Sequence, residues 1–223
     1  RVAGAFLAKN YAGKKVAIVD DKSAYGKGLA DETRKAMNAA GLTEAVSESI
    51  NPGEKDYSAL VSKLKDAGVE AVYFGGYHPE AGLILKQMGE QGLGAKMLSG
   101  DSMNSAELWT IAGKAAENLI FTFAPEPRNV PEAKAIVEEF KKAGYDPEGY
   151  TLYTYAAFQM LKQAAEATKS LDNQKIAEWL RAGNPTQTVL GEIKLDAKGD
   201  LQNPVYVWYT FKDGQYFEDS SIK

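Results

Sequence analysis

The feature that most constrains the fold is a regular alternation of short apolar runs with amphipathic segments over residues 14–124. The apolar runs are rich in β-branched residues, which is typical of buried strands. They span residues 14–21, 44–50, 70–75, 95–100 and 118–124. Helical periodicity fills the intervals between them, with only short links. Because strands and helices alternate, we expect βαβ units that form a mostly parallel sheet with helices on both faces, an α/β fold.

The organisation changes after residue 124. A stretch with three prolines, residues 124–132, indicates a crossover between two parts of the molecule. Three helices are predicted next, over residues 131–143, 150–168 and 172–182. The pattern then predicts a hairpin over residues 191–201 and a strand, turn and edge strand over residues 205–218. The middle helix is apolar around most of its circumference, so it needs burial on several sides.

The start of the chain also indicates missing cover. Residues 1–11 predict a helix with Val2, Phe6 and Leu7 on one side, yet no capping residue precedes it. We therefore expect that the chain begins inside a helix and that part of the protein lies outside these 223 residues.

Composition excludes several classes of function. The net charge of -4 argues against nucleic acid, since phosphate recognition needs a basic face. The chain has no cysteine, which excludes disulfides and thiol catalysis, and its single histidine makes a zinc site a poor expectation. No apolar run approaches the ~20 residues that cross a bilayer. Nothing in the sequence predicts a metal or a cofactor.

Ligands of open parallel sheets bind beyond the carboxyl ends of the strands. Three loops at such ends carry polar or aromatic residues, and phenols around a carboxylate would suit a small cationic group such as an amine. The candidates are Asp21, Ser23 and Tyr25 after the first strand, Tyr77 and His78 after the third, and Ser99, Asp101 and Ser102 after the fourth.

Each candidate also has a structural interpretation. Asp101 could cap the short helix predicted around residues 106–112, Tyr25 could cover its own helix, and Tyr77 could be loop packing. His78 is expected to be structural or solvated, because the spacing suggests no acidic partner for it. The glycines of residues 25–28 do not match a phosphate-binding loop, and hydrolase and metalloprotease motifs are absent, so the sequence gives no support for an enzyme.

Long blocks of the chain resemble a known family. The sequences AIVDDKSAYGKGLADE, NPGEKDYSALVSKLKDAGVEAVYFGGYHPEAG, LSGD, YTLYTYAAFQML and GEIKLDAKGDL together resemble the leucine/isoleucine/valine-type (branched-chain amino acid) periplasmic substrate-binding proteins of ABC transporters. The resemblance implies two Rossmann-like, doubly wound lobes around a ligand cleft. It assigns residues 1–124 to the second lobe, residues 125–203 to the first lobe, and residues 204–223 to terminal strands of the second. The N-terminal part of the first lobe has no counterpart here.

The resemblance also implies functional residues. Tyr25, Tyr77 and Asp101 match ligand-binding positions, with Asp101 receiving the ligand's amino group. Many members carry Glu at that position, so the ligand class extends from branched-chain to other aliphatic amino acids, including 4-aminobutyrate. The family's carboxylate-binding groups lie in the missing part, so we expect this chain alone to bind amino acids no more tightly than about millimolar. The implied partner is the membrane permease of an ABC importer, and the implied location is the periplasm.

Two other classes of function stay open at this point. One is a regulatory module of the same fold that senses an amino acid or amide. The other is an α/β enzyme that uses Asp101 and His78. Exposed apolar surface over residues 150–161 could also drive a dimer or a swapped assembly of the chain.

Overall fold

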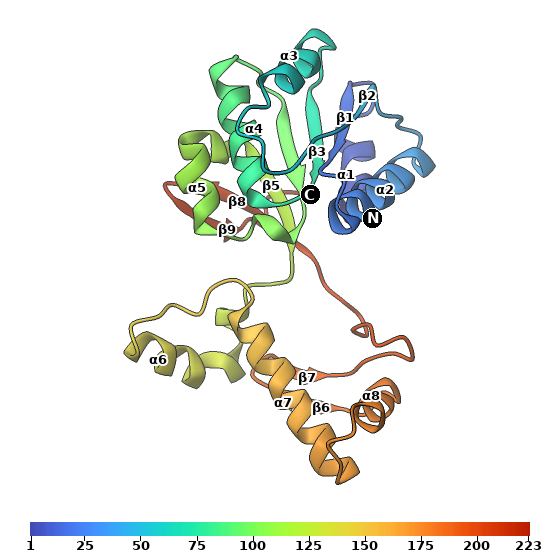
Figure 1. The fold of residues 1–223 in the computed structure, drawn as a ribbon, viewed down its shortest axis with the longest axis vertical. Coiled ribbons are helices and arrows are strands. Elements are labelled where there is room, and N and C mark those ends of the chain that lie inside the picture. Colours follow the sequence, from blue (N-terminus) through green and yellow to red (C-terminus); the bar gives the residue numbers. More distant parts are fainter. The chain divides into compact units, whose positions relative to one another are not determined.

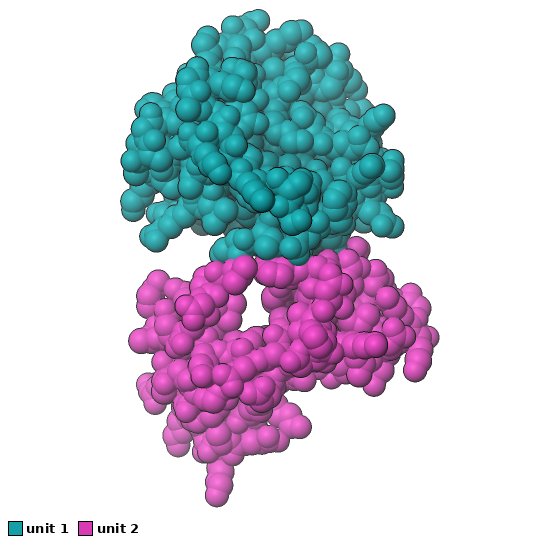
Figure 2. Space-filling view, turned by 180° about the vertical axis from the view of Figure 1, so that it is seen from behind, with its two compact units in different colours: residues 1–123, 206–223 teal, residues 124–205 magenta.

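The computed structural model describes residues 1–223, which divide into two compact units. Unit 1 comprises residues 1–123 and 206–223, and unit 2 comprises residues 124–205 (Figure 2). The chain therefore leaves unit 1, builds unit 2 and returns. None of its helices is both long enough and apolar enough for a transmembrane span.

Unit 1 contains a seven-stranded sheet in the order β2-β1-β3-β4-β5-β8-β9 (Figure 1). The first five strands pair in parallel, whereas β8 and β9 add an antiparallel edge. The mostly parallel sheet predicted from the apolar runs is confirmed. The strands are β1 Val16–Asp20, β2 Val46–Ser49, β3 Ala71–Gly75, β4 Lys96–Ser99, β5 Leu119–Phe123, β8 Val207–Lys212 and β9 Gln215–Glu218.

Helices cover both faces of this sheet (Figure 1). On one face, α1 and α2 bury Leu7, Ala30 and Met37 against Ile18 and Tyr73. The remaining three helices follow β2, β3 and β4 and cover the other face, as right-handed crossovers require when the strand order runs in the opposite direction. The helices are α1 Val2–Asn10, α2 Ala24–Ala39, α3 Ser58–Asp66, α4 His78–Glu90 and α5 Ala106–Ala112.

Unit 2 is mainly helical. Two short 3-10 turns, Pro127–Asn129 and Pro131–Ala133, precede α6, and a two-stranded antiparallel ladder follows α8. Small apolar clusters hold the unit together, one around Leu152 and Val189 and one around Met160 and Leu180. Its elements are α6 Lys134–Lys142, α7 Thr151–Thr168, α8 Asn173–Arg181, β6 Thr186–Thr188 and β7 Gly191–Ile193.

The hairpin predicted over residues 191–201 forms only in part. The observed ladder pairs β6 with β7, and beyond it only an isolated bridge joins Leu195 and Leu201. The turn is stabilised locally, because the Asp196 carboxylate accepts hydrogen bonds from the backbone N–H groups of the three residues Lys198–Asp200. This side-chain turn reverses the chain between Leu195 and Leu201, as the predicted hairpin requires.

The predicted shortage of cover on the middle helix is observed in α7. Its buried side chains, such as Leu152 and Met160, face unit 2's own small clusters. In contrast, Phe158 is 68% exposed and Leu161 is 45% exposed. An apolar helix face of this kind is unusual for a self-sufficient unit.

Candidate functional site

The three candidate loops meet at the carboxyl edge of the unit 1 sheet. β1, β3 and β4 are neighbouring parallel strands, so the segments that follow them leave the sheet side by side. The first loop leads into α2, the second into α4, and the third into a 3-10 turn over Asp101–Met103. This topology explains how residues some 25 to 75 positions apart in the sequence come together.

Tyr25, Tyr77 and Asp101 form one cluster at this edge. The Tyr25 hydroxyl donates a hydrogen bond to Asp101 Oδ1 at 2.7 Å. The rings of Tyr25 and Tyr77 lie 5.0 Å apart between centroids, tilted by 32°. The three side chains that the sequence singled out therefore contact one another in a chain, with Tyr25 in the middle.

Tyr25 is held as a hydrogen-bond donor. Burial raises the pKa of its phenol above the ordinary value, and the bond to Asp101 acts in the same direction, while hydrogen bonds from Ser102 act against it. The phenol consequently keeps its proton at neutral pH. A carboxylate accepts hydrogen bonds at both oxygens, so Asp101 can serve a ligand's donors while it holds the Tyr25 hydroxyl.

Two serines fasten the end of β4 and the segment after it to the end of β3 and the loop that follows it. Ser99 Oγ donates to the Phe74 carbonyl at 2.7 Å, and Ser102 Oγ donates to the Gly76 carbonyl at 2.6 Å. The Ser102 N–H also points to the Tyr25 hydroxyl oxygen at 3.4 Å. Both hydroxyls are thus used to position the site.

Asp21 and Ser23 shape the beginning of α2. Asp21 is 1% exposed, and its Oδ1 accepts hydrogen bonds from the Ser23 N–H and hydroxyl. Ser23 Oγ in turn accepts from the Gly26 N–H and caps the helix. The two residues therefore fix the first turn of α2, on which Tyr25 stands.

The capping interpretation of Asp101 is wrong. The N-cap of α5 is Ser105, whose Oγ accepts from the Glu107 N–H at 3.2 Å. The Asp101 side chain instead bonds to Tyr25, across the sheet edge. The Asp101 carboxylate therefore lies at the carboxyl edge of the sheet, beside the Tyr25 hydroxyl.

His78 has a partner that the sequence did not reveal. Its Nε2 lies 3.0 Å from Glu107 Oε2 on α5. The two residues are 29 positions apart and come from different elements, so no spacing rule could have paired them. The contact ties the start of α4 to α5 and gives His78 a structural role near Tyr77.

Comparison with models of known protein families gives a match over most of the chain. A family model described as periplasmic binding protein matches residues 1–215. The chain belongs to the periplasmic binding protein family. The family resemblance inferred from the sequence blocks is therefore confirmed, as is the α/β fold.

Relatives of this periplasmic binding protein carry names that refer to amino acids. It is 50% identical over 218 residues to Leu/Ile/Val-binding protein homolog 1 of Brucella melitensis, covering 96% of this chain and 59% of the relative. It is 46% identical over 220 residues to an amino acid binding protein of Pseudomonas aeruginosa, covering 97% of this chain and 59% of the relative.

A solved structure gives the same result. The crystal structure of a leucine binding protein from Thermotoga maritima superposes with a TM-score of 0.86 at 30% identity, covering 98% of this chain and 63% of that one. This periplasmic binding protein chain thus spans about three fifths of the relatives it matches. The assignment of units 1 and 2 to two lobes of a receptor stays a prediction.

We expect the free energy of unfolding to fall at alkaline pH because of Tyr73, a buried residue of β3. Burial raises the pKa of Tyr73, which is 2% exposed in β3, to about 12, with the nearby charge of Asp101 adding to the effect. In the unfolded chain a tyrosine ionises near pH 10. The contribution of the buried, neutral Tyr73 to the free energy of unfolding is therefore fully present below about pH 10. It is lost between about pH 10 and 12, because Tyr73 ionises first in the unfolded chain.

Urea unfolding from pH 8 to 11.5 measures this loss. Tyr73→Phe should reduce the slope of the unfolding free energy above pH 10 by up to about 1.4 kcal/mol per pH unit. Tyr145→Phe is the matched control, because Tyr145 is 50% exposed. An unchanged slope in the Tyr73 variant would contradict the burial argument.

Proposed function

We propose that the protein carrying this chain is an extracytoplasmic receptor that binds a small amino acid and delivers it to the membrane permease of an ABC importer. The observation that carries the proposal is the cluster of Tyr25, Tyr77 and Asp101 at the carboxyl edge of the parallel sheet. Family membership and the names of the relatives support it, since those names refer to leucine, isoleucine, valine or amino acids in general.

The ligand's ammonium group is the part that this cluster suits. Asp101 supplies a carboxylate for a charge-assisted hydrogen bond. Tyr25, donating to the same carboxylate, keeps it oriented, and the ring faces of Tyr25 and Tyr77 add cation–π attraction. Because a buried charge is costly unless it is paired, an amine should bind here far better than a neutral group of the same shape.

The class of ligand follows from the length of the acidic side chain. Asp101 is one methylene shorter than Glu, which leaves more room beside the tyrosines. We include branched-chain amino acids, other aliphatic amino acids and 4-aminobutyrate in the proposal. The three residues offer no cation for the ligand's carboxylate, so the receptor must supply those donors elsewhere.

The proposal is for a receptor without catalysis and without a cofactor. An acid–base or nucleophilic enzyme needs a nucleophile and a base within hydrogen-bond reach. Here His78 is engaged with Glu107, and Asp101 is engaged with Tyr25. This arrangement favours recognition of a charged group over proton transfer.

Calorimetric titration of the intact protein with leucine, isoleucine, valine and 4-aminobutyrate tests the proposal. We expect at least one of them to bind in the micromolar range, about -8 kcal/mol. The tightest ligand is then radiolabelled and displaced by analogues. An analogue without the amino group, such as 4-methylpentanoate for leucine, should compete at least about 100-fold more weakly. Equal competition by the des-amino analogue, or no binding by any amino acid, would refute the proposal.

A further inference from the structure

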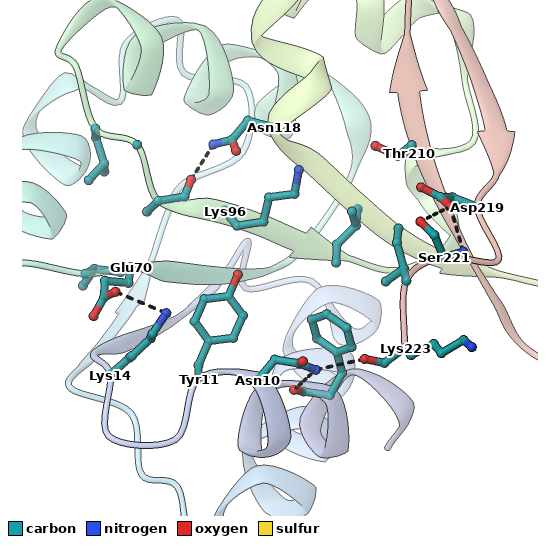
Figure 3. Close-up of a pocket in the computed structure, with 17 residues that line it drawn as sticks. Asn10, Tyr11, Lys14, Glu70, Lys96, Asn118, Thr210, Asp219, Ser221 and Lys223 are labelled. Carbon is teal, nitrogen blue, oxygen red and sulfur yellow. Dashed lines mark hydrogen bonds and ion pairs between the residues drawn. The ribbon is translucent and has the colours of Figure 1, made fainter.

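A second hollow lies at the opposite edge of the unit 1 sheet. Its volume is about 760 Å³, within the ~300–1,000 Å³ range of small-molecule sites. Several of its lining residues come just before a strand or at its start, namely Lys14, Glu70, Ala95, Lys96 and Asn118. The hollow therefore opens at the amino ends of the parallel strands, whereas Tyr25, Tyr77 and Asp101 follow their carboxyl ends. Figure 3 shows its lining side chains.

Among the charged side chains around this hollow, Lys14 and Glu70 form an ion pair with each other. The ammonium of Lys14 lies 3.6 Å from the Glu70 carboxylate. The Asp219 carboxylate accepts hydrogen bonds from the N–H and the hydroxyl of Ser221. Both contacts are drawn as dashed lines in Figure 3.

Lys96 differs from these residues. Its Nζ donates to the Glu117 carbonyl at 3.1 Å, and none of the ion pairs in the structure includes it. An ammonium has three donors, so two are left for another partner. Burial lowers the pKa of Lys96, as expected for a cation that has lost water without gaining a counter-ion.

Apolar side chains form one part of the wall. Phe6 from α1, Leu93 before β4, Ile120 from β5 and Ile222 from the C-terminal segment all line the hollow. Leu93 and Ile120 are themselves buried, which makes this wall a fixed part of the core. The hollow thus places an unpaired ammonium beside a fixed apolar surface, which is the combination that an anionic group on a short hydrocarbon requires.

We propose that this hollow is a second binding site, which takes a small monocarboxylate with a short apolar chain. The carboxylate accepts hydrogen bonds from the Lys96 ammonium, and the chain lies against Phe6, Ile120 and Ile222. The site differs from the Tyr25–Asp101 cluster in charge preference, since it attracts an anion and that cluster attracts an amine. It does not depend on the proposed receptor function.

Titration of the intact protein with hexanoate tests the site, with hexan-1-ol as the neutral analogue. Hexanoate should bind with a Kd of about 1 mM or tighter, and hexanol about tenfold more weakly. In ¹H–¹⁵N NMR spectra, hexanoate should shift the amide signals of Gly94, Ala95, Lys96 and Asn118. Equal affinity for the acid and the alcohol, shifts confined to other residues, or no binding of hexanoate by about 10 mM would each overturn the proposal.

Variants separate the roles of charge and packing. Lys96→Met keeps an unbranched apolar stem and should weaken hexanoate binding about tenfold while it leaves hexanol unchanged. Lys96→Arg should keep the affinity within about threefold. Lys162→Met, which removes a 75%-exposed lysine of unit 2, is the matched control and should have no effect. If Lys96→Met fails to fold, Lys96→Arg and the acid–alcohol comparison still decide the matter. An unchanged Kd in a folded Lys96→Met would refute the assignment.

Competition with an amino acid distinguishes this proposal from the amino-acid receptor function. A saturating concentration of the tightest amino-acid ligand should leave the Kd of hexanoate unchanged. If the amino acid displaces hexanoate, the two ligands share one site and the hollow is not a second one.

Discussion

Amino-acid binding should fall about 100-fold in the intact protein when Asp101 is replaced by Asn. The carboxamide has nearly the same shape and can still accept the Tyr25 hydrogen bond, which is 2.7 Å long in the wild type. What it removes is the negative charge that faces the ligand's ammonium. Loss of one partner of a desolvated charge pair costs about 2–5 kcal/mol, and about 2.7 kcal/mol corresponds to a factor of 100. Displacement of the radiolabelled amino acid measures the change.

The controls for this variant follow from the structure. Asp101→Glu restores the charge and should recover most of the affinity, with a preference for smaller ligands because the longer side chain fills space. Asp200→Asn removes a carboxylate of which 66% of the side chain is exposed and should leave binding unchanged. A loss of amino-acid affinity smaller than about threefold in Asp101→Asn would contradict the assignment of the amine site. Abolished turnover of any substrate would instead favour the enzyme interpretation.

The cluster of Tyr25, Tyr77 and Asp101 could be predicted from the sequence because it depends on topology alone. Three strands that are neighbours in a parallel sheet must present their carboxyl ends at one edge. The contacts within that edge could not be predicted in the same way. His78 contacts Glu107 only because α4 packs on α5. Asp21 accepts a hydrogen bond from Ser23 only because α2 begins with that capping turn.

The elements of unit 1 are more predictable than those of unit 2 for a physical reason. Buried strands such as β1 and β3 are continuous apolar runs, which few other structures tolerate. The β6 strand is only three residues long, Thr186–Thr188, and its pairing is decided by the turn around Gly191, where φ is +82°. A one-sequence pattern contains little information on such short ladders.

The hollow at Lys96 could not be predicted from the sequence either. Its lining residues run from Phe6 to Lys223, so they are brought together by α1, four strand ends and the C-terminal segment. No motif links these residues in sequence. A site built this way can be found only once the sheet order is known.

The second prediction concerns the stability of the fold when either of two glycines of α2 is replaced by Ala. Gly26→Ala should destabilise the fold by about 2–4 kcal/mol, because an added Cβ would lie 2.4 Å from the Gly75 carbonyl oxygen and 2.2 Å from Asp21 Oδ1. Gly28, in the same helix, has no heavy atom within 4 Å of an added Cβ and is exposed. Gly28→Ala should therefore stabilise the fold by about 0.5–1 kcal/mol, through better helix propensity. Urea unfolding of both variants measures the difference.

The same pair of variants connects packing to the site. The contact between Gly26 and Gly75 brings α2 against the end of β3, and Tyr25 and Tyr77 each lie next to this contact point. If Gly26→Ala displaces the start of α2, it should also separate the Tyr25 hydroxyl from Asp101 and weaken amino-acid binding, whereas Gly28→Ala should leave binding intact. Equal stability of the two variants would show that α2 can shift without cost. Lost stability with full binding would show that the site does not depend on this close approach.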